Sequence, residues 1–149
     1  MFKYIVFLLL LYTASIQAMH HTLTMANIAV TKTITAVVGS TCHITDRMNA
    51  ISEINDDKNT IIIVTVVCNG INGFTQYLMN VYDDIDGEIA VSTPIIVGAG
   101  DMSDFRVESI NMTDNNIIVS GIQWTGSKTN HSINRRYILQ DHIFIKKDK

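Results

Sequence analysis

Proline, cysteine and charged side chains are all scarce in this 149-residue chain. Pro94 is the only proline, there are two cysteines, and Asp, Glu, Lys and Arg together make 17% of the residues. A disordered chain would be rich in charge and poor in apolar residues, whereas 47% of these residues are hydrophobic. The net charge of −3 gives no electrostatic basis for coating DNA or RNA. The composition therefore predicts a single globular domain that does not bind nucleic acid.

The first 18 residues have the three-part layout of a secretory signal peptide. Lys3 supplies a charged start, residues 5–11 form an unbroken apolar run, and small residues lead to Ala18. That run is shorter than the roughly 20 residues a membrane-spanning helix needs, and no later segment is apolar enough to span a bilayer. We therefore predict an exported protein, periplasmic or extracellular, whose residues 19–149 form one domain. Loss of Lys3 would change the net charge from −3 to −4.

Cys42 and Cys68 are the only cysteines, and both follow the predicted cleavage site. Two lone cysteines in an oxidising compartment usually pair, so we predict a Cys42–Cys68 disulfide. A catalytic pair of Cys42 with His43 is disfavoured, because neighbours on a strand point to opposite faces. Zinc is disfavoured too, since the sequence has no CxxC or HxxxH spacing.

Residues that favour strands recur along the chain, separated by turns rich in Gly, Asn and Asp. We predict an all-β fold, an antiparallel β-sandwich or small barrel of about 7–9 strands. The expected strands are residues 23–38, 60–68, 74–82, 88–92, 95–97, 105–112, 117–124 and 136–146.

Two of the remaining patterns say more about local structure. The run from Thr60 to Cys68 is almost entirely apolar, which predicts a central strand buried on both faces. In residues 46–55, Met48, Ile51 and Ile54 are spaced by three, which is compatible with one short helix or an irregular crossing.

Two short segments suggest metal binding. If cleavage follows Ala18, the new amino terminus is Met19-His20-His21, and a free amine with His in third position can wrap Cu(II) or Ni(II). Asp84 and Asp86 precede Gly87 as in a calcium loop, but Tyr82 and Thr93 stand where two further ligands are required. The same segment is a plain hairpin signal, which we favour. Copper and calcium are thus alternatives, and the sequence predicts no other cofactor.

A binding surface is expected where three polar loops, residues 69–73, 98–104 and 126–134, meet at one end of the domain. Aromatic and basic residues near the last loop belong to the types that dominate interface energetics. These candidates are Trp124, Lys128, His131, Arg135, Arg136 and Tyr137. The favoured function is a binding module for a protein or another extracytoplasmic ligand.

Catalysis has little support in the sequence. It contains neither GxSxG nor HExxH, so we predict no enzyme, and a hydrolase of unfamiliar type using His43, His131 or His142 is a further alternative. Metal handling through the amino terminus is the other alternative. Asn111 and Asn130 begin glycosylation sequons, which would act only in a eukaryotic or viral secretory pathway.

Overall fold

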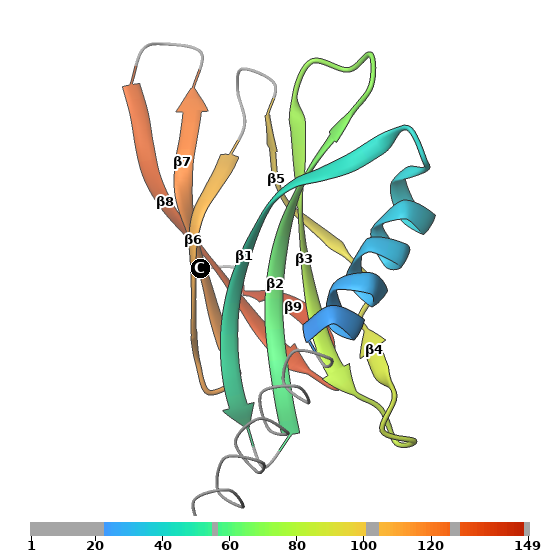
Figure 1. The fold of residues 1–149 in the computed structure, drawn as a ribbon. Helices are drawn as coiled ribbons and strands as arrows, with labels where there is room; N and C mark the ends of the chain where they lie inside the picture. Colours follow the sequence, from blue (N-terminus) through green and yellow to red (C-terminus); the bar gives the residue numbers. More distant parts are fainter. Residues whose placement is uncertain (1–22, 55–56, 101–104, 126–128, 148–149) are drawn as a thin grey trace, which may run out of the picture.

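The computed structural model describes residues 23–54, 57–100, 105–125 and 129–147. Within these ranges the chain forms a helix over residues 23–38 and then nine strands (Figure 1). The strands are β1 (Cys42–Ile54), β2 (Asp57–Cys68), β3 (Phe74–Asp83), β4 (Ile89–Val91), β5 (Ile95–Gly100), β6 (Phe105–Thr113), β7 (Asn116–Thr125), β8 (Thr129–Gln140) and β9 (Ile143–Lys147).

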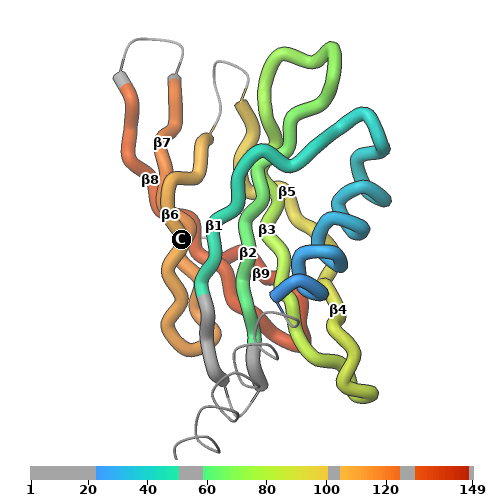
Figure 2. The backbone as a smooth tube through the Cα atoms, viewed as in Figure 1, coloured from blue at the N-terminus to red at the C-terminus, as the bar shows by residue number. Residues whose placement is uncertain are grey.

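The strands form two antiparallel sheets, which confirms the predicted all-β fold and its sandwich form. One sheet has the order β1-β2-β3-β4, and β5 also pairs with β3. β4 and β5 follow one another along the same edge of β3, at Val81–Asp83 and at Phe74–Leu78, with Pro94 between them. The other sheet is a meander of β6, β7, β8 and β9. The first sheet thus consists of β1 to β5 and the second of β6 to β9. The colours of Figure 2 show this order along the chain.

Two apolar clusters hold three layers together. The first lies between the sheets and includes Ile61, Leu78 and Val119, all fully buried. The second lies between the helix and the outer face of the five-stranded sheet, where Val30 packs with Val64 and other residues. Because β2 contributes alternately to both clusters, its near-continuous apolar run is explained, and its predicted central position between β1 and β3 is confirmed.

The helix corrects the expectation that residues 23–38 form a strand. Its buried side chains, Val30 and Ile34, are four residues apart, and half-buried Ala26 extends the same stripe. This is the spacing of a helix face, and packing of that face against the sheet outweighs the strand preference of the many Thr, Ile and Val residues. Gly39 ends the helix with a φ of 86° and donates its N–H to the Thr35 carbonyl at 2.9 Å.

Two further expectations are corrected by strand pairing. Residues 46–55 were expected to allow a short helix, but 46–54 belong to β1, which pairs with β2 along its length, from Cys42 opposite Cys68 to Ile54 opposite Asp57. The single strand predicted over residues 136–146 is two strands, because Asp141 and His142 adopt positive φ angles and turn the chain between β8 and β9.

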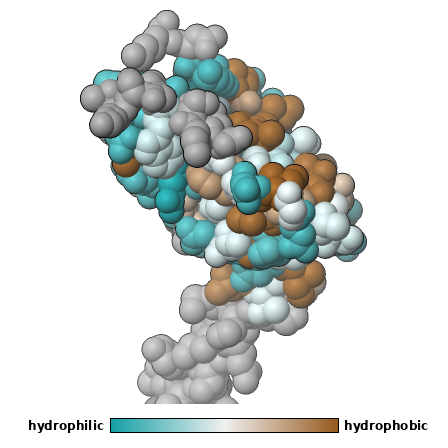
Figure 3. Space-filling view, turned by 90° about the horizontal axis from the view of Figure 1, so that it is seen from above, coloured by the Kyte–Doolittle hydropathy of each residue, from teal (hydrophilic) through white to brown (hydrophobic). Residues whose placement is uncertain are grey.

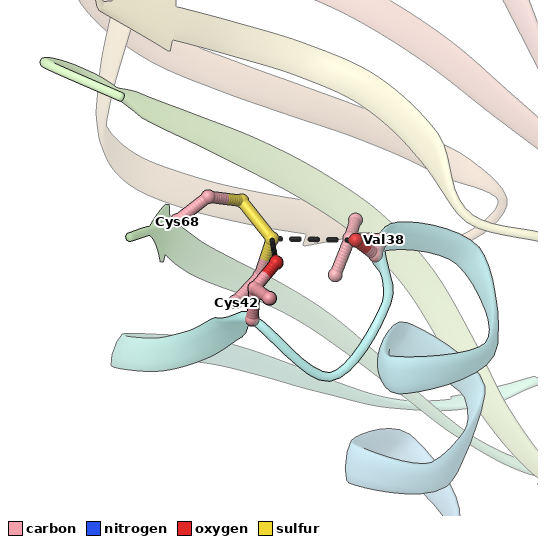
Figure 4. Close-up of a disulfide and its surroundings, with 4 residues drawn as sticks. Val38, Cys42 and Cys68 are labelled. Carbon is pink, nitrogen blue, oxygen red and sulfur yellow. Dashed lines mark hydrogen bonds between the residues drawn. A yellow bond between two sulfur atoms is a disulfide. The ribbon is translucent and has the colours of Figure 1, made fainter. Parts of the chain in front are cut away.

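The predicted disulfide is present where the ladder between β1 and β2 ends. Cys42 and Cys68 are register partners, and their sulfur atoms are bonded (Figure 4). The Sγ atom of Cys42 also lies 3.3 Å from the carbonyl oxygen of Val38, a close contact because a disulfide sulfur carries no hydrogen to donate. The bridge therefore fixes the start of β1 beside the end of the helix.

Candidate binding surfaces

The strand ends that flank the three predicted loops lie together at one end of the sandwich (Figure 1). Loop 69–73 contacts the end of β5 there, lining with Ala99 and Gly100 a shallow hollow of about 240 Å³. Figure 3 looks onto this end and shows hydrophobic and hydrophilic residues interspersed. Residues 101–104 and 126–128, which complete the other two loops, lie outside the described residues, and Lys128 is among them.

The remaining candidate residues lie on β7 and β8 but do not share one surface. Trp124 is half-buried near the end of β7, and His131 is exposed opposite Gln123. Arg136 is exposed, whereas Tyr137 is 4% exposed and belongs to the core between the sheets. Successive residues of a strand point to opposite faces, so the sequence cluster is divided between the interior and the outer face.

Arg135 is committed to contacts inside the sandwich. Its Nη1 donates to the carbonyl oxygen of Val97 at 2.8 Å, and its guanidinium carbon lies 4.0 Å from the centre of the Phe105 ring. Burial raises the pKa of Tyr137 above its ordinary value of 10.0, an effect that the neighbouring Arg135 guanidinium partly offsets. Arg135 therefore links β8 to β5 and β6 and is not available as a surface anchor.

Gln76 provides a second polar link between the sheets. This 2%-exposed side chain accepts the N–H of Val107 at 2.7 Å and donates to the Val107 carbonyl at 3.2 Å. It also donates to the Thr65 hydroxyl at 3.2 Å. Val107 precedes a register shift in β6, so the Gln76 amide pairs with backbone groups as a neighbouring strand would. Gly98 is required beside it, since a Cβ there would lie 2.7 Å from the Phe105 carbonyl oxygen.

A third polar link involves His142. Its ring stacks on Tyr82 with centroids 3.6 Å apart, and its Nδ1 lies 3.2 Å from the side-chain nitrogen of Asn80. That nitrogen also donates to Oδ1 of Asn59 at 2.8 Å. These are the contacts of a half-buried side chain that fixes the β8–β9 turn on the first sheet, and none of them is with a nucleophile.

A hollow of about 900 Å³, which we call the basic hollow, lies along β8 and β9. It is lined by Asn116, Ser132, Ile133, Asn134, Arg135, Arg136, Ile138, Lys146 and Lys147. Arg136 and Lys147 are register partners, so two exposed cations face each other across the strands. No ion pair is found for Arg136, Lys146 or Lys147 within the described ranges.

Sequence reasoning identified Arg136 but missed both lysines as its neighbours. The turn at Asp141-His142 folds β9 back beside β8 and so brings its lysines near Arg136. The sequence signal for this turn is weak, because Asn-Gly or Asp-Gly is the usual pair in such a turn.

The described residues add no support for the copper site or for the calcium site. Met19, His20 and His21 lie outside the described residues. Oδ1 of Asp84 accepts the N–H groups of Asp86 and Glu88, both at 3.0 Å, as in the predicted hairpin turn. Among the described residues no group of three or more His, Cys, Asp or Glu side chains is placed to hold a metal ion.

Comparison with known proteins adds no further constraint. No protein-family model, curated protein or solved structure matches the chain. Within the part of the chain that is described, the helix is not long and apolar enough to cross a membrane. The functional argument therefore rests on the surfaces themselves.

Proposed function

We propose that this protein is an exported binding module whose basic hollow takes an acidic segment of a protein partner. The observation that carries the proposal is the pair of exposed cations, Arg136 and Lys147, held opposite each other with no carboxylate partner in the described ranges. Like charges placed directly opposite on a sheet destabilise it. A carboxylate from a partner would remove that repulsion and leave the fold unchanged.

The two sheets differ in what covers them, and this difference favours the second sheet as the interface. The helix packs on the outer face of the first sheet through the buried side chains of Val30 and Ile34. In the described chain no element packs on the corresponding face of the second sheet. That face exposes Ile143 and Ile145 beside the cations, and an apolar centre with a charged rim is the usual composition of a protein interface.

Export is part of the proposal and rests on two features. The first 18 residues have the layout of a signal peptide, and the disulfide suits an oxidising compartment. The test is the intact mass of the secreted protein with and without reduction. We expect a mass that begins at Met19 and two thiols that appear only on reduction. A retained leader or free thiols would contradict export.

Binding is tested with a synthetic peptide of alternating Glu and Ile, followed by fluorescence anisotropy. The protein should bind it more weakly as salt rises, because exposed charges are screened. Arg136→Glu with Lys147→Glu should abolish binding. Lys32→Glu is the matched control, since Lys32 is exposed on the helix that covers the other sheet. Equal loss in the control, or none in the double variant, would overturn the proposed interface.

A further inference from the structure

The hairpin between β3 and β4 carries negatively charged side chains, which complement the positive charge of the basic hollow. Its exposed residues include four acids: Asp83, Asp84, Asp86 and Glu88. Ile85 stands at the tip with a relative exposure of 105%, so its side chain touches almost nothing in its own molecule. An exposed Ile between carboxylates is complementary in charge and polarity to a basic, partly apolar surface.

The conformation of this tip is fixed before any contact is made. The N–H of Asp84 donates to the Glu88 carbonyl at 2.9 Å, and the N–H of Gly87 donates to the Asp84 carbonyl at 2.9 Å. Gly87 has a φ of 74°, which glycine adopts without strain. Together with the Asp84 carboxylate bonds these contacts hold Ile85 outward, so docking would cost little conformational entropy.

The tip and the basic hollow complement each other in charge and in polarity. The register partners Arg136 and Lys147 line the hollow from one face of the strands, and half-buried Ile138 lines it beside them. Its volume of about 900 Å³ lies within the range of roughly 300–1,000 Å³ usual for ligand sites. Among the described residues no hydrogen bond or ion pair joins the tip to the hollow.

We propose that the partner for the basic hollow is a second copy of this chain, which inserts its β3–β4 hairpin tip. This inference rests on the proposed function and names its partner. Each contact joins two different surfaces, so after the first contact one molecule keeps a free hollow and the other keeps a free tip. Such a heterologous contact continues into a ring or a chain of molecules and does not stop at a dimer.

The experiment uses sedimentation velocity on the purified, disulfide-bonded protein and two variants. The tip variant carries Ile85→Ser and Asp86→Lys, and it keeps Asp84, whose carboxylate holds the turn. The hollow variant carries Arg136→Glu and Lys147→Glu, which replaces one like-charged pair by another. Melting curves of both variants should match the wild type, because all four side chains are exposed.

The expected result is concentration-dependent assembly of the wild type that high salt reverses, and monomers for each variant alone. The two variants mixed should form a 1:1 complex and nothing larger, because only one intact tip and one intact hollow remain. A wild type that stays monomeric while the hollow still binds the acidic peptide would overturn self-assembly and leave the binding proposal standing. Loss of both activities would overturn both, and assembly in both variants alone would place the contact elsewhere.

Discussion

The Gln76 side chain should be one of the most costly single residues to replace in this domain. Gln76→Leu keeps the approximate size of the side chain but removes every hydrogen bond that it makes. The N–H and the carbonyl of Val107 would lose their partner, and the Thr65 hydroxyl would lose one donor. A buried polar group left unpaired costs about 1–3 kcal/mol. Two such backbone groups, less the gain from burying Leu, suggest a loss of about 3 kcal/mol in the free energy of unfolding.

Urea unfolding followed by Trp124 fluorescence measures this loss. With a slope of about 2 kcal/mol per molar urea, the midpoint should fall by about 1.5 M. Thr65→Val is the control, because it removes only one of the partners of Gln76 and leaves the Val107 pair intact, so its cost should stay below about 1 kcal/mol. A Gln76→Leu midpoint within about 0.3 M of the wild type would refute the assignment of Gln76 as the link between the sheets.

Three further predictions concern charge, the disulfide and pH. Arg136→Glu places a carboxylate opposite Lys147, so thermal stability at low salt should rise while binding of the acidic peptide is lost; a fall in stability would contradict the proposed repulsion. Reducing the Cys42–Cys68 bridge, which closes a loop with a sequence separation of 26, should lower the free energy of unfolding by about 3 kcal/mol in urea, and an unchanged midpoint would contradict this. Because burial raises the pKa of Tyr137, its stabilising contribution should be complete below pH 10 and decline as pH rises through the raised value. Above pH 10 the melting temperature of Tyr137→Phe should therefore fall less steeply with pH than that of the wild type. Identical slopes would contradict this prediction.

Patterns that depend on close neighbours in sequence predicted this fold well. The apolar run from Thr60 to Cys68 predicted a doubly buried strand, and the Asp-rich segment before Gly87 predicted a hairpin. Both depend on local rules, namely burial on two faces and a positive φ at glycine. The disulfide was predicted from the count of two cysteines and the expected oxidising compartment.

The helix was missed because composition and periodicity disagreed. Thr, Ile and Val favour strands, whereas Ala26, Val30 and Ile34 recur every four residues as on a helix face. The opposite error occurred at residues 46–55, where a spacing of three suggested a helix. There the long ladder with β2 decided the structure, and no local pattern reveals such pairing.

The structure divides the predicted cluster of Arg135, Arg136 and Tyr137, because successive side chains of a strand point to opposite faces. The sequence predicts a loop over residues 126–134, which groups Arg135, Arg136 and Tyr137 in one cluster. In the structure β8 begins at Thr129, and its alternation sends Tyr137 inward and Arg136 outward. Lys147 of β9 lies opposite Arg136 because of the β8–β9 turn, whose Asp-His sequence is an unusual turn signal.

The division of the chain into two successive sheets has a consequence for how the protein is made. Apart from β3 with β5, every strand pairs with the strand next to it in sequence, so each sheet needs only nearby segments to form. The first sheet and its helix can therefore fold before the second sheet has been synthesised. Until then the inner face with Ile61 and Leu78 has no cover, and Gln76 has no partner in β6. Docking of β6 to β9 covers this apolar face and supplies the hydrogen-bond partner of Gln76 in one step. The first sheet is therefore most prone to aggregate before this docking.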